Sequence, residues 1–172
     1  MATSFNYPSE KAGLPPGALI HVGREPAAAS RITVMSYSGD HCEEHPAATV
    51  DDILRLRVAG VTLWVHCEGL DMVATLEAIG RSFAVHPLVL EDILNTHQRP
   101  KFEEYDDYLF LVLKTLNGDH TLKVEHEQIS ILLFEGLLFT FREKSDGLFQ
   151  GLHQRLTNAK GRALWRLFGE FG

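Results

Sequence analysis

Residues 86–116 read HPLVLEDILNTHQRPKFEEYDDYLFLVLKTL and combine a helix start, a chain break and a long apolar strand. His86 and Pro87 open the helix, because proline at the first helical position lacks only an amide hydrogen that would be unpaired there. The helix is expected to end near Asn95, before a short extended piece at 101–105. The stretch therefore predicts a helix that leads directly into a sheet.

The second half of the stretch is a strand over 108–116 with a continuous apolar run at 109–113. Such a run is typical of a strand whose two faces are both covered. Asn117-Gly118 then predicts a hairpin turn. Further on, the pattern predicts two strands around Glu135-Gly136 and a helix that begins near Asp146; the strands span 121–133 and 137–143.

The elements before residue 86 alternate between strands and helices. Thr49 is a suitable N-cap for a helix at 50–56, because its hydroxyl can accept from free backbone amides. The remaining apolar patterns predict strands at 18–22, 31–37 and 61–66 and a helix from Leu70 to Gly80. Together the elements predict an α/β fold, a three-layer α/β/α arrangement with a mixed parallel and antiparallel sheet.

Composition excludes several classes of function. The chain has 172 residues, 45% of them hydrophobic, and a formal charge of −7 without a basic run, which argues against nucleic acid as a partner. Its two cysteines form no disulfide framework. The longest apolar tract, 129–141, is interrupted and falls short of the roughly 20 residues of a membrane helix. No signal peptide is recognisable at the N-terminus. No common catalytic motif is recognisable either, so we expect a protein that is not an enzyme.

Glu91 and Asp92 are the strongest candidates for a metal site. They are expected on an exposed side of their helix, opposite Leu90 and Leu94, with a second acidic group at 103–107. Mg²⁺ prefers carboxylate oxygens and keeps most of its waters, so two adjacent acids suffice as half a site. The alternative is that these are ordinary solvated acids.

Two histidine-containing segments are weaker candidates. His41-Cys42-Glu43-Glu44-His45 contains ligands suited to Zn²⁺, but its spacing matches no tetrahedral motif and we expect a polar loop. His66 lies near a strand end, where a histidine is more often a satisfied polar group than a ligand. Neither segment predicts a site by itself.

The stretch at 86–116 resembles the signature region of the CorA family of magnesium transporters. Three further segments are similar to the family: residues 13–23 to the start of its cytoplasmic domain, Trp64 with Gly69-Leu70 to its tryptophan strand and glycine turn, and 127–130 to its meander. The resemblance covers about residues 13–162. It implies a disordered tail at 1–17, a cytoplasmic α/β domain at 18–160 and, at 161–172, the start of a helix towards a missing stalk.

The resemblance also implies a function. In this family the cytoplasmic domains of a homopentameric, channel-like protein sense Mg²⁺ at the cytoplasmic face of the cell membrane. A metal held between neighbouring copies favours the closed state, a role that falls on Asp92 first and Glu91 second. The regulatory ion would be Mg²⁺, with Co²⁺ or Ni²⁺ possible, bound weakly in the isolated domain, and membrane contact would come only through segments beyond Gly172.

Two alternatives remain open. The chain could be the soluble domain of a zinc-transporting relative, because a soluble domain does not identify the transported ion. It could also be a stand-alone binding or scaffold module that lacks a pore.

Overall fold

The computed structural model describes Leu19 and residues 30–38, 41–46, 48–70, 72–118, 124–144 and 147–157. The expected tail at 1–17 and linking helix at 161–172 lie outside these residues. So does the strand expected at 18–22, apart from Leu19, which is not in a strand and packs against the core.

The described residues form a mixed α/β fold around a seven-stranded sheet in the order β2-β1-β3-β7-β6-β5-β4. Neighbouring strands are antiparallel except for the parallel pair β3 and β7. The mixed sheet predicted from the sequence is confirmed. The strands are β1 (Arg31–Ser38), β2 (His41–Pro46), β3 (Thr62–Glu68), β4 (Lys101–Glu104), β5 (Tyr108–Gly118), β6 (Val124–Phe134) and β7 (Leu137–Arg142).

Four helices accompany the sheet in the described part of the chain, and two begin as the sequence predicts. Thr49 caps the first helix in a capping box with Asp52. His86 caps the third, whose first residue is Pro87, by accepting a hydrogen bond from the Leu88 amide on its Nδ1 atom at 3.2 Å. The helices are α1 (Val50–Leu56), α2 (Val73–Phe83), α3 (Pro87–Leu94) and α4 (Gln150–Thr157).

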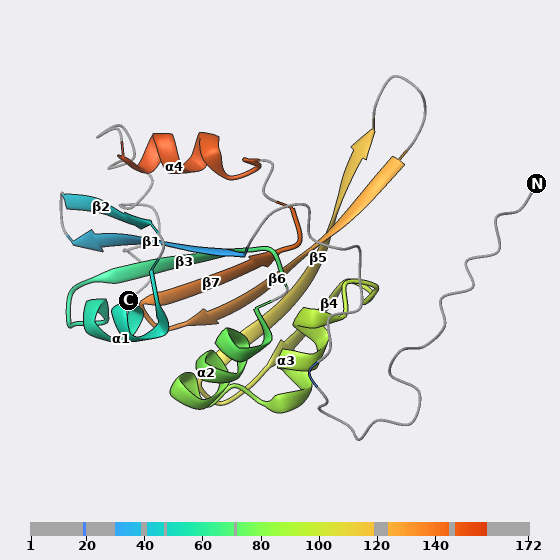
Figure 1. Ribbon diagram of the computed structural model, residues 1–172, viewed down its shortest axis with the longest axis horizontal. Coiled ribbons are helices and arrows are strands. Elements are labelled where there is room, and N and C mark those ends of the chain that lie inside the picture. The colour runs from blue at the N-terminus through green and yellow to red at the C-terminus, as the bar shows by residue number, and fades with distance from the viewer. Residues whose placement is uncertain are drawn as a thin grey trace, which may run out of the picture.

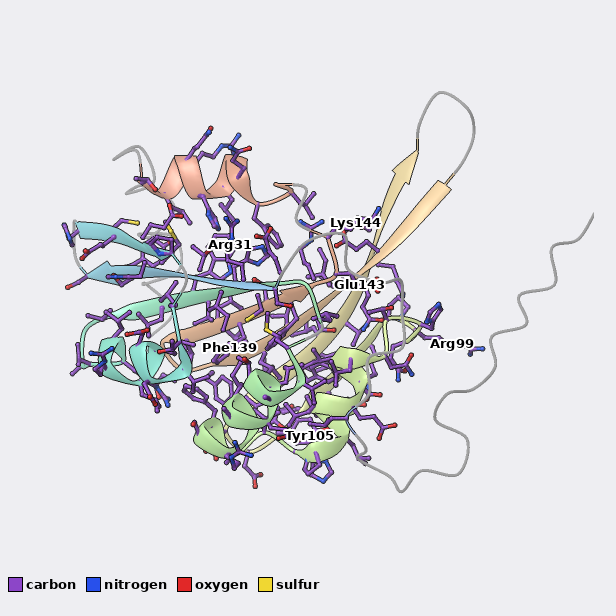
Figure 2. All side chains as sticks on the ribbon, in the orientation of Figure 1. Arg31, Arg99, Tyr105, Phe139, Glu143 and Lys144 are labelled. Carbon is purple, nitrogen blue, oxygen red and sulfur yellow. The ribbon has the colours of Figure 1, made fainter. Side chains whose placement is uncertain are left out.

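The helices lie on both sides of the sheet, with α4 on one side and α1, α2 and α3 on the other (Figure 1). Strand alternation explains the division, because successive side chains point to opposite faces. On β3, Val65 and Cys67 belong to the core, whereas Trp64 and His66 contact aromatic side chains of the α4 segment. Figure 2 shows Phe139 between the sheet and the α1–α3 side, where its ring contacts Phe83 of α2.

In the second half of the chain, two local predictions are wrong. Asn117 and Gly118 do not form the turn; they continue β5 and pair with Glu125 and Val124 of β6. A dipeptide signal is local, whereas the register of this hairpin is determined along the whole ladder between the two strands. The final helix begins at Gln150 rather than near Asp146.

Strand β5, next to the edge strand β4, is covered by the described residues on one face only. Phe110 and Val112 are fully buried, but Leu113, on the opposite face, is 44% exposed. On the same face, Leu133 is 43% and Phe102 60% exposed. The apolar run predicted a strand covered on both faces, but the described residues cover only one of them.

Candidate metal-binding regions

Helix α3 holds Glu91 and Asp92 on its less buried side. Leu90 and Leu94 are buried in the core, as the helical spacing predicts. Glu91 and Asp92 are nevertheless half-buried rather than exposed. For Asp92 the reason is that the chain after α3 folds back, so that Lys101 at the start of β4 reaches it.

Asp92 already has two donors on its carboxylate. Lys101 donates to Oδ2 at 2.6 Å, and the Gln98 amide donates to Oδ1. The Asp92 side chain is 21% and the Lys101 side chain 26% exposed, so the pair is accessible to solvent from one side. A cation that approached Asp92 would therefore compete with an ammonium group.

Lys101 also joins Asp92 to the second acidic group. Its Nζ atom donates to Glu103 Oε1 at 2.7 Å, and Tyr105 donates to the other Glu103 oxygen at 3.1 Å. The hydrogen bond from Lys101 lowers the pKa of Glu103. Burial acts to lower the pKa of Lys101, but its hydrogen bonds with the two carboxylates outweigh this and raise it. We call Asp92, Gln98, Lys101 and Glu103 the α3–β4 corner.

The other members of the acidic group lie outside this arrangement. Glu104, Asp106 and Asp107 are exposed at the end of β4 and in the turn that follows. The structure thus brings one residue of the second group, Glu103, to the same lysine as Asp92.

The sequence did not predict a polar network that lies between the α3–β4 corner and the sheet. Gln128 of β6 donates to the backbone oxygen of Asp92 at 3.2 Å and to Ser130 at 3.2 Å. Lys114 of β5 donates to the backbone oxygen of Thr96 at 2.6 Å. The signal was the polar pair Gln128 and Ser130 at alternate positions on the face of β6 that turns towards the helices. The network fixes the end of α3 to the sheet.

A buried ion pair lies on the other face of β6 and β7. Arg142 is fully buried and donates to Glu127, which also accepts from the Lys144 amide at 3.1 Å. The Arg142 guanidinium lies 5.6 Å from the centre of the Phe149 ring, just before α4. The pair therefore stands between the network below α3 and the underside of α4.

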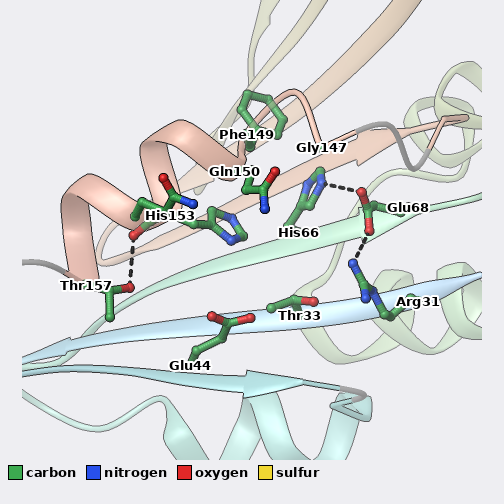
Figure 3. A pocket seen from close by; sticks show the side chains of 11 residues that line it. Arg31, Thr33, Glu44, His66, Glu68, Gly147, Phe149, Gln150, His153 and Thr157 are labelled. Atoms are coloured by element: carbon green, nitrogen blue, oxygen red, sulfur yellow. Dashed lines mark hydrogen bonds and ion pairs between the residues drawn. The ribbon is translucent and has the colours of Figure 1, made fainter.

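A cavity of about 550 Å³ lies between α4 and the sheet (Figure 3). Its floor comes from β1, β2 and β3 and its roof from residues 147–157. The polar side chains that turn towards it include two imidazoles and two carboxylates that are far apart in the sequence. They are Glu44, His66, Glu68 and His153, with Arg31 at the edge.

His66 is held firmly in the floor of this cavity. Its Nδ1 atom lies 2.8 Å from Thr140 Oγ1, and the same Oγ1 accepts a hydrogen bond from the Trp64 indole at 2.9 Å. On the other side, Nε2 lies 3.5 Å from Glu68, whose second oxygen accepts from Arg31 at 2.7 Å. Burial lowers the pKa of His66 to about 4, although Glu68 opposes the shift, and burial also lowers the pKa of His153.

The segment 41–45 is a strand, not the loop that we expected. It is the edge strand β2, paired with β1, and alternation places His41, Glu43 and His45 on one face and Glu44 on the other. His41 and His45 lie 3.8 and 4.0 Å from the same Glu43 oxygen. Nowhere in the described ranges do three or more His, Cys, Asp or Glu side chains already surround a common metal position.

The described residues define a mixed α/β domain with two polar regions, the α3–β4 corner and the cavity under α4. None of the helices that the structure describes has the length and apolar content needed to cross a bilayer.

Comparison with known proteins identifies the family. The model of the CorA-like Mg²⁺ transporter proteins matches residues 59–165. The cobalt/magnesium transport protein CorA of Thermotoga maritima is 36% identical over 154 residues, which are 89% of this chain and 44% of that protein. The chain belongs to the family of CorA-like Mg²⁺ transporter proteins, and the resemblance noted in the sequence is confirmed. This is a family of transporters rather than enzymes.

Solved structures agree on the fold. The full-length CmaX protein superposes with a TM-score of 0.58 at 15% identity, covering 80% of this chain and 41% of CmaX. The cytoplasmic domain of ZntB from Vibrio parahaemolyticus superposes with a TM-score of 0.56 at 20% identity, covering 77% of this chain and 52% of that domain. The chain spans less than half the length of the CorA relative.

Proposed function

We propose that this chain is the cytoplasmic, Mg²⁺-sensing regulatory domain of a CorA-type transport channel for Mg²⁺ or Co²⁺. The observation that carries the proposal is the α3–β4 corner in a chain of this family. There, a partly exposed carboxylate is held by an ion pair with a lysine. A relative with 36% identity is named a cobalt/magnesium transport protein, which supports these two ions.

The sensing step is an exchange of cations at Asp92. At low Mg²⁺ the carboxylate is paired with Lys101, and at high Mg²⁺ a hydrated ion takes the place of the ammonium group, with Glu91 as the second ligand. Mg²⁺ suits such a site, because it retains several waters and needs only one or two carboxylates from the protein. An ion that bridges two copies stabilises the closed assembly only while it is bound.

The remaining ligands come from a neighbouring copy in a homopentamer. Segments outside the described residues make the membrane contact, and the domain lies at the cytoplasmic face of the cell membrane. In the proposed arrangement, residues 1–17 form a tail, residues 18–160 form the domain, and residues 161–172 begin the link to the stalk.

The three-layer α/β/α arrangement is part of the proposal. The sheet face shared by α4 carries Phe102, Leu113 and Leu133, all more than 40% exposed. Apolar side chains on neighbouring strands form a patch that water disfavours. We propose that helices outside the described residues cover this face in the full-length protein and complete the second helical layer.

The two alternatives have less support. Similarity to the ZntB domain concerns the fold alone, so zinc transport has no support from the site. In a stand-alone module, no neighbouring copy would complete a metal site at Asp92, and no further helices would cover the apolar sheet face.

Thermal unfolding with and without Mg²⁺ tests the proposal. With millimolar affinity, 10 mM Mg²⁺ would stabilise the domain by about 1.4 kcal/mol, which corresponds to a rise in Tm of about 3 to 6 °C for a chain of this length. Asp92→Asn should abolish the rise. Glu104→Gln is the matched control, because it removes one negative charge from an exposed residue of the neighbouring strand and should preserve the rise. An equal rise in wild type and Asp92→Asn would contradict the proposal.

A further inference from the structure

We propose that the cavity under α4 binds a transition-metal ion such as Zn²⁺ or Co²⁺ through His66, Glu68 and His153. The site is separate from the α3–β4 corner and does not depend on the proposed Mg²⁺-sensing function. The bound ion would hold α4, the last described helix, against the sheet.

His66 and Glu68 already have the geometry of two ligands of one ion. They occupy positions i and i+2 of β3, so both side chains leave the same face of the sheet. Their facing atoms, His66 Nε2 and Glu68 Oε1, are 3.5 Å apart. Two ligand atoms on a tetrahedral Zn²⁺ with bonds of roughly 2.1 Å lie about 3.4 Å apart.

The outer atoms of both ligands are fixed as in known metal sites. Thr140 holds the His66 ring through Nδ1, and Trp64 in turn orients Thr140. Arg31 holds the second oxygen of Glu68. Hydrogen bonds of this kind orient ligating imidazoles and carboxylates towards a metal.

His153 supplies the third ligand from the roof of the cavity. Its ring centre is 6.0 Å from that of His66, and its Nε2 atom is buried without a hydrogen-bond partner in the described part of the chain. Two imidazoles bound to one Zn²⁺ at roughly 2.1 Å have ring centres about 5 to 6 Å apart. A buried nitrogen without a partner is unfavourable, and coordination would satisfy it. Glu44 lines the same cavity and can provide a fourth oxygen.

The ligand atoms favour a transition metal over Mg²⁺. Imidazole ligands suit Zn²⁺, Co²⁺ and Ni²⁺, whereas Mg²⁺ prefers oxygen.

A small adjustment of α4 completes the site. The three side chains do not yet converge on one point among the described residues, so the His153 ring must turn towards His66. Helix α4 has no fully buried residue, and this loose packing permits the turn. Metal binding should therefore make the position of α4 more rigid.

Calorimetric titration of the metal-free 172-residue chain with Zn²⁺ at pH 7 is the direct test. We expect one Zn²⁺ per chain and at least about a tenfold weaker affinity in His66→Gln, Glu68→Gln and His153→Gln. His41→Gln and His45→Gln are the matched controls, because they remove imidazoles from the edge strand β2, the rival zinc site. They should leave the affinity unchanged, as should an excess of Mg²⁺.

Co²⁺ absorption provides the second readout, since a low-symmetry site with imidazole ligands gives intense visible bands that depend on both histidines. Folding of each variant is checked by circular dichroism, and His153→Gln decides the matter if His66→Gln fails to fold. No Zn²⁺ binding by wild type, or unchanged affinity in His153→Gln, would overturn the proposal. A loss confined to His41→Gln or His45→Gln would overturn it as well and move the site to β2.

Discussion

The α3–β4 corner and the cavity under α4 contain similar side chains in different settings. In the corner, Asp92 and Lys101 are about one quarter exposed and lie close together in the sequence. In the cavity, the side chains of His66 and Glu68 are 5% and 6% exposed, and their partners come from distant parts of the chain. A partly exposed ion pair can change partners at little cost, whereas a buried polar group must keep a partner at all times. The corner is thus suited to reversible sensing and the cavity to a fixed arrangement.

The largest effect is expected at the ion pair between the two regions. Glu127→Ala leaves the Arg142 guanidinium, fully buried in the wild type, without this carboxylate, and should reduce the free energy of unfolding by about 3 to 5 kcal/mol. Urea unfolding measures the loss. The double variant Glu127→Leu/Arg142→Met removes both charges and should be more stable than Glu127→Ala. If it is less stable, the buried charge is not the cause of the loss.

An intermediate effect is expected from pH at the cavity. Burial lowers the pKa of His66 to about 4 in the folded chain, while the unfolded chain has about 6.5. The unfolded state therefore binds the proton first, so this contribution to stability is complete above pH 6.5 and is lost as the pH falls towards 4. Between pH 7 and pH 5 the loss is about 2 kcal/mol.

Urea unfolding in the presence of a chelator measures this slope without any metal. His66→Gln should flatten it, leaving the contribution of His153, whose pKa burial lowers in the same direction. An identical slope in His66→Gln would show that other groups cause the acid sensitivity.

These two regions also show which features of the fold and of the sites can be predicted from the sequence. The capped helices and most strands were predictable, because Thr49, Pro87 and the alternating apolar residues act within a few positions along the chain. Asp92 was predicted as a metal ligand in the same way, but its pairing with Lys101 depends on how the chain returns after α3. The cavity could not be predicted, because it exists only once β1, β3 and α4 have packed together.

The edge strand β2 shows a related limit. Its polar composition indicated a loop. The structure shows a strand that is paired along one edge only and has both faces largely open to solvent, so few apolar side chains are needed there. Propensity describes how well a side chain fits a half-buried, pleated surface, and such a strand barely needs that fit.

The smallest effect on stability, and the most informative for sensing, is expected in the corner. Lys101→Met keeps the apolar stem, whose ammonium group lies 5.1 Å from the Phe110 ring centre, and removes the charge from Asp92 and Glu103. The free energy of unfolding should change by less than about 1 kcal/mol, because partly exposed ion pairs contribute little. Affinity for Mg²⁺ should rise roughly fivefold, since a competing charge worth about 1 kcal/mol is gone.

Arg55→Met is the control, because it removes a charge of the same sign from the exposed pair with Asp52 in α1 and should leave Mg²⁺ affinity unchanged. Calorimetric titration with Mg²⁺ distinguishes the outcomes. Equal affinity in Lys101→Met and wild type would mean that Lys101 does not compete with the ion, and the cation exchange proposed for the corner would then be wrong even if Asp92 binds Mg²⁺.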